Sequence, residues 1–168
     1  MKSGVVARMH SVISEAVAVL KEVLAVHHLR IDIMMPKDDS LRIIAHTNGY
    51  LDSETTMVLK SGEGCAGKAW ANKLDVIADL TKTSDPVRDW SIPLEENQKV
   101  SDNLKSILSV PIYAPKTYDP ALGEGDVVGI LNVDSEEKIT DKFPSLSRTV
   151  LQTYIYVLSQ LLMEVDNV

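Results

Sequence analysis

The segment Asp85-Pro86-Val87-Arg88-Asp89-Trp90 groups side chains that could contact a small molecule. It holds one cation, two carboxylates and one indole, and small-molecule sites combine aromatic surface with a few polar groups. The surrounding stretch, 81–103, is rich in charge and carries two prolines, which predicts a long loop over a pocket. The alternative is that Trp90 fills the core and Arg88 is solvated.

Cys65 is the single cysteine of the chain. One thiol cannot form an internal disulfide, and it cannot both attack and resolve a disulfide within one protomer. We interpret Cys65 as a small buried residue, and the cysteine content is that of a protein in a reducing, cytoplasmic compartment.

Three glycines, Gly62, Gly64 and Gly67, lead into a short helix predicted near 66–72. Backbone N–H groups at a helix start can hold an anion. However, Gly67-Lys68 is followed by Ala69, where a phosphate-binding loop requires Ser or Thr. We expect the glycines to permit a tight turn and close packing.

Residues that could bind metal or perform catalysis form no recognised motif. No cysteine or carboxylate lies at metal-ligand spacing from the four histidines, and no nucleophile elbow, zincin helix or triad context is present. We therefore expect no metal and no enzyme. The histidines are His10, His27, His28 and His46.

The charge of −7 argues against nucleic acid and against anionic membrane surfaces as partners, because the basic residues are scattered singly along the chain. No continuous block of about 18 apolar residues occurs, so neither a transmembrane helix nor a secretory signal is expected.

The pattern of apolar residues predicts one domain over 1–168. An N-terminal helix is expected within 1–27, periodic from Val5 to Val26, a sheet core with long loops over 28–140, and a C-terminal helix within 141–168, from Pro144 to Val165. The last helix is apolar on more than one face. This predicts a homodimer in addition to contact with the sheet, although both helices could simply cover their own domain.

Alternating residues predict strands at 29–35, 41–46, 76–80, 106–113 and 126–134, with a hairpin turn over 36–40. Leu131 and Val133 should share one face of the last strand with Val127, and Ile130 should share the other with Val128. Pro111 predicts a bulge or an edge, and Gly129 permits the close approach of another group. A second loop is expected at 114–125. Together these elements predict an α+β fold.

Four segments, in this order and spacing, resemble the GAF family: GEGCAGKAW at 62–70, VIADL at 76–80, LKSILSVPI at 104–112 and VGILNVDS at 128–135. The resemblance implies a GAF/PAS-like central antiparallel sheet of about five or six strands. Both terminal helices would pack on one face, and a pocket would lie between the other face and the long loops. Many members of the family dimerise through the terminal helices.

The resemblance also places ligand contacts in the loop over the pocket and on the neighbouring strands. It implies a ligand-binding set of Asp79, Arg88, Trp90, Ser106, Ser109 and Asn132. The stretch that begins at Asp134 departs from the signature of cyclic-nucleotide-binding members at its leading residues, so the ligand is not named, and no cofactor is identified.

The resemblance implies a regulatory domain that senses a small molecule, dimerises, and passes its signal to an output domain or a partner protein. One alternative is a ligand-free dimerisation module with its pocket filled by side chains. The other is a relative of the family members that reduce free methionine sulfoxide. Those members use several cysteines, whereas this chain has one, so we expect no enzymatic activity.

Overall fold

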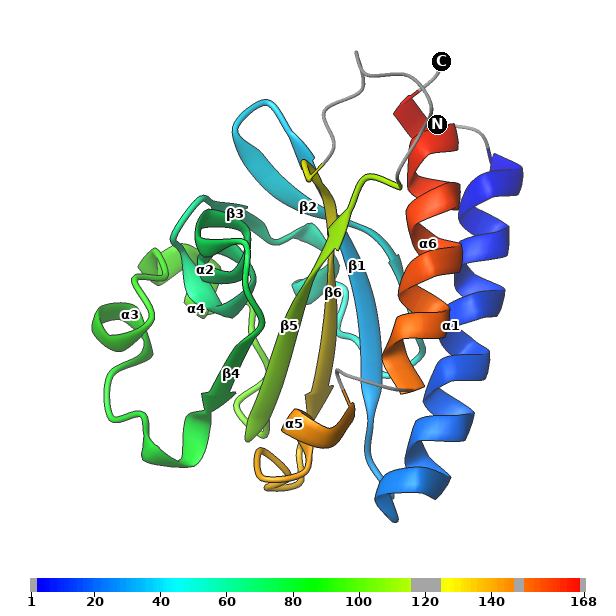
Figure 1. The fold of residues 1–168 in the computed structure, drawn as a ribbon. Coiled ribbons are helices and arrows are strands. Elements are labelled where there is room, and N and C mark those ends of the chain that lie inside the picture. The colour runs from blue at the N-terminus through cyan, green and yellow to red at the C-terminus, as the bar shows by residue number, and fades with distance from the viewer. Residues whose placement is uncertain (1–2, 116–124, 147–149, 167–168) are drawn as a thin grey trace.

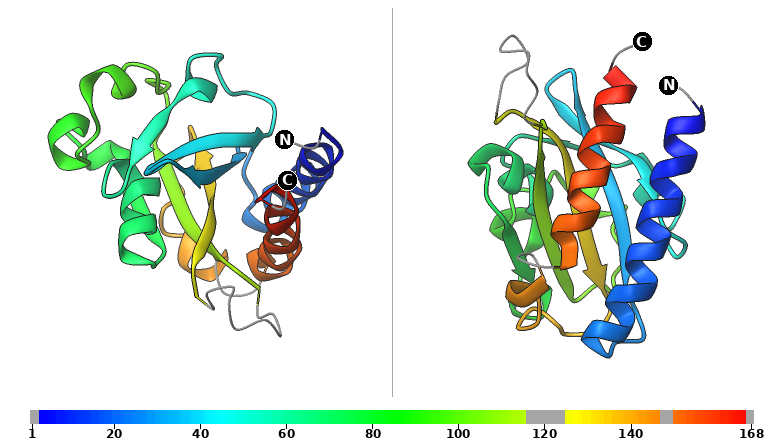
Figure 2. Two further views of the ribbon diagram at one scale, coloured as in Figure 1. Left: turned by 90° about the horizontal axis from the view of Figure 1, so that it is seen from above. Right: turned by 45° about the vertical axis from the view of Figure 1, so that its right-hand side comes forward.

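A six-stranded antiparallel sheet, in the order β3-β2-β1-β6-β5-β4, divides the protein into two layers (Figure 1). The computed structural model describes residues 3–115, 125–146 and 150–166. Helices α1 and α6 lie side by side on one face, as Figure 2 shows, and α2, α3 and α4 lie on the other side of the sheet. The predicted α+β fold with both terminal helices on one face is confirmed. The strands are β1 (Arg30–Lys37), β2 (Ser40–His46), β3 (Val58–Lys60), β4 (Val76–Asp79), β5 (Ser106–Tyr113) and β6 (Val127–Ser135).

The N-terminal helix α1 (Ser3–Leu24) begins and ends slightly earlier than the periodicity predicts, and Ala25 follows it with a φ of 52°. Among the described residues, α1 is the one helix that is long and apolar enough to cross a membrane. In the structure its apolar stripe packs on the sheet and on α6. The cytoplasmic location stays a prediction. The buried stripe is Val5, Met9, Ile13, Ala16, Leu20 and Leu24.

The C-terminal segment is not the single helix predicted from Pro144 to Val165. The structure has a short helix α5 (Phe143–Leu146) and a longer helix α6 (Val150–Asp166), and 147–149 lie outside the described residues. Helix α6 buries one face on the sheet and leaves Tyr156 68% exposed. Its buried residues are Leu151, Leu158, Ser159, Leu161, Leu162 and Val165.

The hairpin between β1 and β2 turns more tightly than predicted. Pro36 and Lys37 still pair with β2, so the turn consists of Asp38 and Asp39 alone. Both have positive φ, 49° and 61°, a conformation that short polar side chains tolerate better than most. The predicted turn over 36–40 was too wide, because Pro36 and Lys37 remain within the β1–β2 ladder.

A bulge corrects the predicted faces of β6. Ile112 pairs with Gly129, but Tyr113 pairs with Val127, so Val128 is an extra residue. An extra residue reverses the alternation beyond it. Val128 therefore packs with the core under α1 and α6, and Val127 packs on the opposite face.

Pro111 and Gly129 have the roles that the sequence predicts. Strand β4 pairs with β5 only over 106–109, so among the described strands Pro111 has a neighbour on one side alone. A Cβ on Gly129 would lie 2.7 Å from Cδ1 of Leu162, which is the close approach expected, made by α6.

The long excursion over 81–103 contains short helices where a loop was predicted. They are the 3₁₀ turn η2 (Leu80–Lys82), α3 (Pro86–Asp89) and α4 (Leu94–Asn97). The turn η1 (Glu54–Thr56) and the edge strand β3 were not predicted either. Of the second predicted loop, only 114–115 and Gly125 are described.

Candidate functional site

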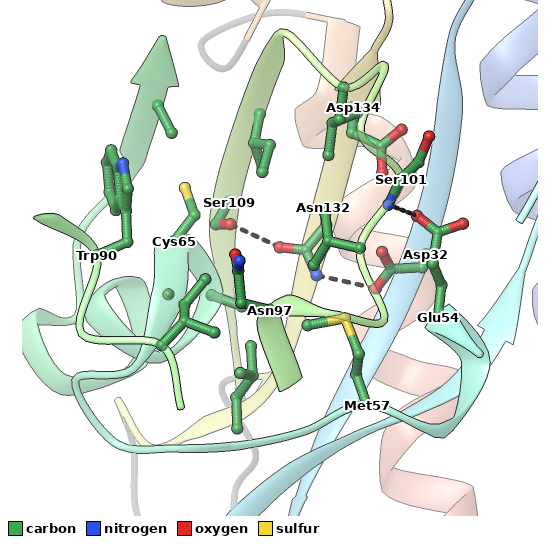
Figure 3. Close-up of a pocket in the computed structure, with 18 of the residues that line it drawn as sticks. Asp32, Glu54, Met57, Cys65, Trp90, Asn97, Ser101, Ser109, Asn132 and Asp134 are labelled. Atoms are coloured by element: carbon green, nitrogen blue, oxygen red, sulfur yellow. Dashed lines mark hydrogen bonds between the residues drawn. The ribbon is translucent and has the colours of Figure 1, made fainter. Parts of the chain in front are cut away.

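A cavity of about 260 Å³ lies on the side of the sheet opposite α1 and α6 (Figure 3). Strands β1, β6, β5 and β4 contribute its floor, and α2, α3 and α4 with their connections contribute the walls. The lining is largely apolar, and its floor also carries polar side chains on β1, β6 and β5. The apolar lining includes Met34, Ile43, Met57, Leu59, Leu80, Trp90, Ile92 and Leu104.

Antiparallel register brings three polar residues of the floor together. Asn132 on β6 lies opposite Asp32 on β1 and opposite Ser109 on β5. The Ser109 hydroxyl donates to Oδ1 of Asn132 at 2.6 Å, and Nδ2 of Asn132 donates to Oδ1 of Asp32 at 2.8 Å (Figure 3). The three side chains form one fixed row of hydrogen-bonding groups across three strands.

A buried arginine lies behind one end of this row. Nε and Nη2 of Arg30 donate to the two oxygens of Asp134 at 2.7 and 3.2 Å. Its Nη1 and Nη2 donate to the two oxygens of Glu54 at 3.0 and 3.1 Å. Tyr50 stacks on the guanidinium, whose central carbon lies 4.1 Å from the ring centroid. These two bidentate contacts fix the positions of Arg30, Asp134 and Glu54.

Burial raises the pKa of Asp32 to about 7. The hydrogen bonds with Asn132 and Tyr50 oppose this shift, but both partners are uncharged and only partly offset the loss of water around a carboxylate. Burial also raises the pKa of Asp134, whereas the two hydrogen bonds from Arg30 lower it and so oppose this shift. The floor therefore contains a carboxyl group that can gain or lose a proton near neutral pH.

Cys65 lies in the first turn of α2 (Gly64–Asn72) and lines the cavity. Its Sγ lies 3.3 Å from the carbonyl oxygen of Val76, to which the thiol donates. Burial raises the pKa of this thiol to about 12, so at neutral pH it is protonated. The thiolate is the nucleophilic form, and this environment disfavours it.

The glycines before α2 perform the packing role predicted for them. Gly62 and Gly64 have positive φ, 89° and 64°. A Cβ on Gly67 would lie 2.3 Å from the carbonyl oxygen of Lys60, so only glycine fits there. The N–H of Gly64 donates to the carbonyl oxygen of Trp90 at 2.8 Å, which ties α2 to the end of α3.

Three of the six predicted ligand-binding residues line the cavity: Trp90, Ser109 and Asn132. Nε1 of Trp90 donates to the Thr83 hydroxyl at 3.2 Å, and Nζ of Lys68 lies 4.7 Å from the centroid of the indole. Trp90 thus lines the cavity and also contacts the ammonium group of Lys68.

The other three predicted residues have different places. Asp79 accepts from the N–H of Thr81 at 3.1 Å and starts η2. The Arg88 side chain is 71% exposed and pairs with Asp89. The Ser106 hydroxyl donates to the carbonyl oxygen of Glu137 at 2.9 Å and fixes the loop after β6. The structure does not bring these three to the cavity.

Sequence reasoning missed Asp32, Tyr50 and Glu54. Asp32 carries a detectable signal, because it is a charged residue between the apolar neighbours of a predicted strand. Glu54 and Tyr50 lie in an irregular segment whose path the sequence pattern does not predict. Within the described ranges no group of three metal-ligating side chains is arranged around an ion site, and the expectation of no metal stays a prediction.

No protein-family model and no curated protein matches the sequence of the chain. The fold, however, is similar to solved structures. The nlh2 GAF domain of A. aeolicus has a TM-score of 0.59 at 16% identity and covers 97% of this chain and 96% of its own. A GAF domain/HD domain protein from Geobacter sulfurreducens has a TM-score of 0.63 at 14% identity, over 96% and 97%. The chain has a GAF-like fold.

Enzymes share this fold as well. A type II free methionine-R-sulfoxide reductase from Thermoplasma acidophilum has a TM-score of 0.61 at 15% identity and covers 95% of this chain and 96% of its own. Other solved structures of free methionine-R-sulfoxide reductases are also similar. The expectation that this chain is not an enzyme, drawn from its single cysteine and its lack of catalytic motifs, was wrong, because the same fold carries both regulatory domains and reductases and so does not exclude enzymatic activity.

Proposed function

We propose that the chain is a small-molecule-sensing domain that binds its ligand in the cavity above β1, β6 and β5. One observation carries the proposal: the cavity joins an apolar wall to a row of polar groups that are already fixed by one another. Apolar surface with a few positioned polar groups is the usual composition of a small-molecule site. Trp90, Ser109 and Asn132 would contact the ligand.

A chain of aromatic contacts supports a sensing role, since it joins the cavity to α1. Tyr50 lines the cavity, and the His46 ring meets it edge-on with centroids 5.5 Å apart. The His10 ring of α1 meets His46 edge-on at 5.8 Å, and His10 Nδ1 lies 2.9 Å from the His46 carbonyl oxygen. A ligand that moves Tyr50 would change contacts made by α1.

The signal would leave the domain through a homodimer formed by α1 and α6. The observation behind this proposal is apolar surface that the domain itself does not cover: Tyr156 and Val157 on α6 are exposed, as is Val23 near the end of α1. A ligand-induced shift of α1 against its partner would then be passed to an output domain or a partner protein.

The test measures thermal stability with a panel of metabolites and nucleotides, because a ligand that binds only the native state raises the melting temperature. Ile107 lines the cavity, and Ile107→Trp should abolish the rise by filling it. Ile77→Trp is the matched control, because Ile77 is exposed on the neighbouring strand and does not line the cavity. An equal rise in both variants would place the ligand elsewhere, and no rise with any compound would contradict the proposal.

A second candidate function is reduction of free methionine-R-sulfoxide, favoured by the position of Cys65 in the cavity wall. The thiol would accept the sulfoxide oxygen as a sulfenic acid, and a second thiol must then reduce it. Since the chain has one cysteine, dithiothreitol would supply that thiol. Turnover by the wild type that Cys65→Ser abolishes would establish this function, and absence of turnover would leave sensing as the use of the cavity.

A further inference from the structure

The cavity is lined by four carboxyl side chains, and its lining among the described residues includes no Lys, Arg or His. Glu54 and Asp134 share the buried Arg30, which lies behind the lining. Asp102 is exposed to solvent. Asp32 is buried, and its hydrogen-bond partners, Asn132 and Tyr50, are both uncharged. The cavity therefore has more acidic than basic groups at its surface, and Asp32 is the buried carboxyl group among them that has no hydrogen bond from Arg30.

The hydroxyl of Tyr50 has one proton and two carboxyl neighbours. It lies 3.1 Å from Oδ2 of Asp32 and 3.0 Å from Oδ2 of Asp134. It can donate to only one of them. Arg30 contacts both oxygens of Asp134 and favours its ionised form, so Tyr50 donates to Asp134. The proton for the contact between the Tyr50 oxygen and Oδ2 of Asp32 must then come from Asp32, which is protonated and donates to Tyr50.

We propose that the cavity takes a ligand with one cationic nitrogen group, an ammonium or amidinium on an apolar body, and that this group replaces the proton on Asp32. The proton leaves to solvent, so the charge at Asp32 stays balanced. The apolar wall accommodates the body of the ligand. This inference rests on the proposed function, because it names the ligand class of the same cavity.

The groups that face Asp32 set the direction of the pH dependence. They are Tyr50, Asp134 and Arg30, and Glu54 and Asp102 line the same cavity. A carboxyl group with a pKa of about 7 is ionised to roughly one tenth at pH 6 and nine tenths at pH 8. A primary ammonium keeps its charge at both pH values, because alkylamines titrate near pH 10. Affinity for a cation should therefore increase about tenfold from pH 6 to pH 8.

Calorimetric titration of the full chain would test this with butylamine, hexylamine and phenethylamine, each compared with the alcohol of the same skeleton. We expect at least one amine to bind, its alcohol to bind at least tenfold more weakly, and affinity for the amine to rise about tenfold between pH 6 and pH 8. In two buffers of different ionisation enthalpy, binding at pH 6 should release close to one proton, and at pH 8 close to none.

Asp32→Asn should lose both the affinity for the amine and its pH dependence, while Asp141→Asn, at an exposed position that does not line the cavity, should change the affinity less than threefold. If Asp32→Asn does not fold, the number of protons that the wild type releases on binding at pH 6 and pH 8 tests the inference by itself. Equal binding of amine and alcohol, binding without proton release at pH 6, or no binding of any amine would overturn the inference. A neutral or anionic compound that stabilises the wild type but not Ile107→Trp would overturn it and leave the proposed function standing.

Discussion

Asp32 and Arg30 show how single residues determine the chemistry of the cavity floor. Arg30 stabilises two buried carboxylates, Asp134 and Glu54, through hydrogen bonds, but it acts on the third, Asp32, only through its charge. A buried carboxylate without a charged partner is costly, and protonation removes that cost. The role of Asp32 thus depends on the partners that surround it.

At this scale the sequence predicts only part of the site. Trp90, Ser109 and Asn132 could be predicted to line the cavity, because the resemblance places Ser109 and Asn132 on strands and Trp90 in the loop over the pocket. The Arg30–Asp134–Glu54 contacts could not. Arg30 and Asp134 lie 104 positions apart and meet through the register of β1 against β6, and Glu54 reaches Arg30 through the path of an irregular segment.

The pH dependence of stability should reveal the state of Asp32. Its pKa is about 7 in the folded chain and near 3.8 in the unfolded chain, so the folded protein binds the proton more tightly. The stability that this gives is complete below pH 4 and is lost as the pH rises through 7. As the pH rises from 5 to 8, the free energy of unfolding of Asp32→Asn, measured in urea, should increase by about 2–3 kcal/mol relative to that of the wild type. A difference that stays constant over this range would contradict the assignment.

Replacing Arg30 should destabilise the domain strongly. Arg30→Met leaves Asp134 and Glu54 buried without their cation, and loss of one partner of a buried ion pair costs about 3–5 kcal/mol. The control is Arg8→Met, which removes an exposed ion pair with Glu164 and should cost less than about 1 kcal/mol. Similar denaturant midpoints for Arg30→Met and Arg8→Met would contradict the role of Arg30.

At the scale of elements, the register of the sheet assembles the site. Asp32, Asn132 and Ser109 meet because β1, β6 and β5 pair with these residues opposite one another. The strands could be predicted from alternation, but the bulge at Val128 could not, because both Val127 and Val128 are apolar and fit either face. The short helices α3 and α4 could not be predicted either, since four residues carry too little periodicity.

Packing of α6 on the sheet depends on Gly129. Gly129→Ala places a methyl group 2.7 Å from Leu162 Cδ1 and 3.3 Å from the Met34 carbonyl oxygen. Overpacking of this kind costs about 1–3 kcal/mol, measured by urea unfolding. Gly4→Ala in α1 meets nothing within 4 Å and should be neutral or slightly stabilising. Leu162→Ala should lessen the effect of Gly129→Ala, and purely additive effects would contradict this contact.

At the scale of the whole molecule, the sheet separates two surfaces with different roles. One face holds the cavity. The other face holds α1 and α6 (Figure 1). The proposed sensing mechanism requires that they communicate, and the Tyr50, His46 and His10 rings are the contacts that join them.

The oligomeric state tests the proposed role of the helical surface. Light scattering should give the mass of a dimer for the wild type and of a monomer for Tyr156→Glu, because the substitution places a charge on the exposed apolar surface of α6. Leu94→Glu is the control, since Leu94 is also a large hydrophobic residue and is 62% exposed, but it lies on α4, on the cavity side. A monomeric wild type, or loss of the dimer in both variants, would contradict dimerisation through α1 and α6.

The most direct test of ligand binding in the cavity compares the indole N–H signals of the two tryptophans in a nitrogen-correlated NMR spectrum. Trp90 lines the cavity, whereas Trp70 is absent from its lining, and Trp90→Phe assigns the two signals. When the compound that most raises the melting temperature is added, the Trp90 signal should move and the Trp70 signal should stay. Movement of Trp70 alone, or of neither signal at saturation, would contradict a ligand site in this cavity.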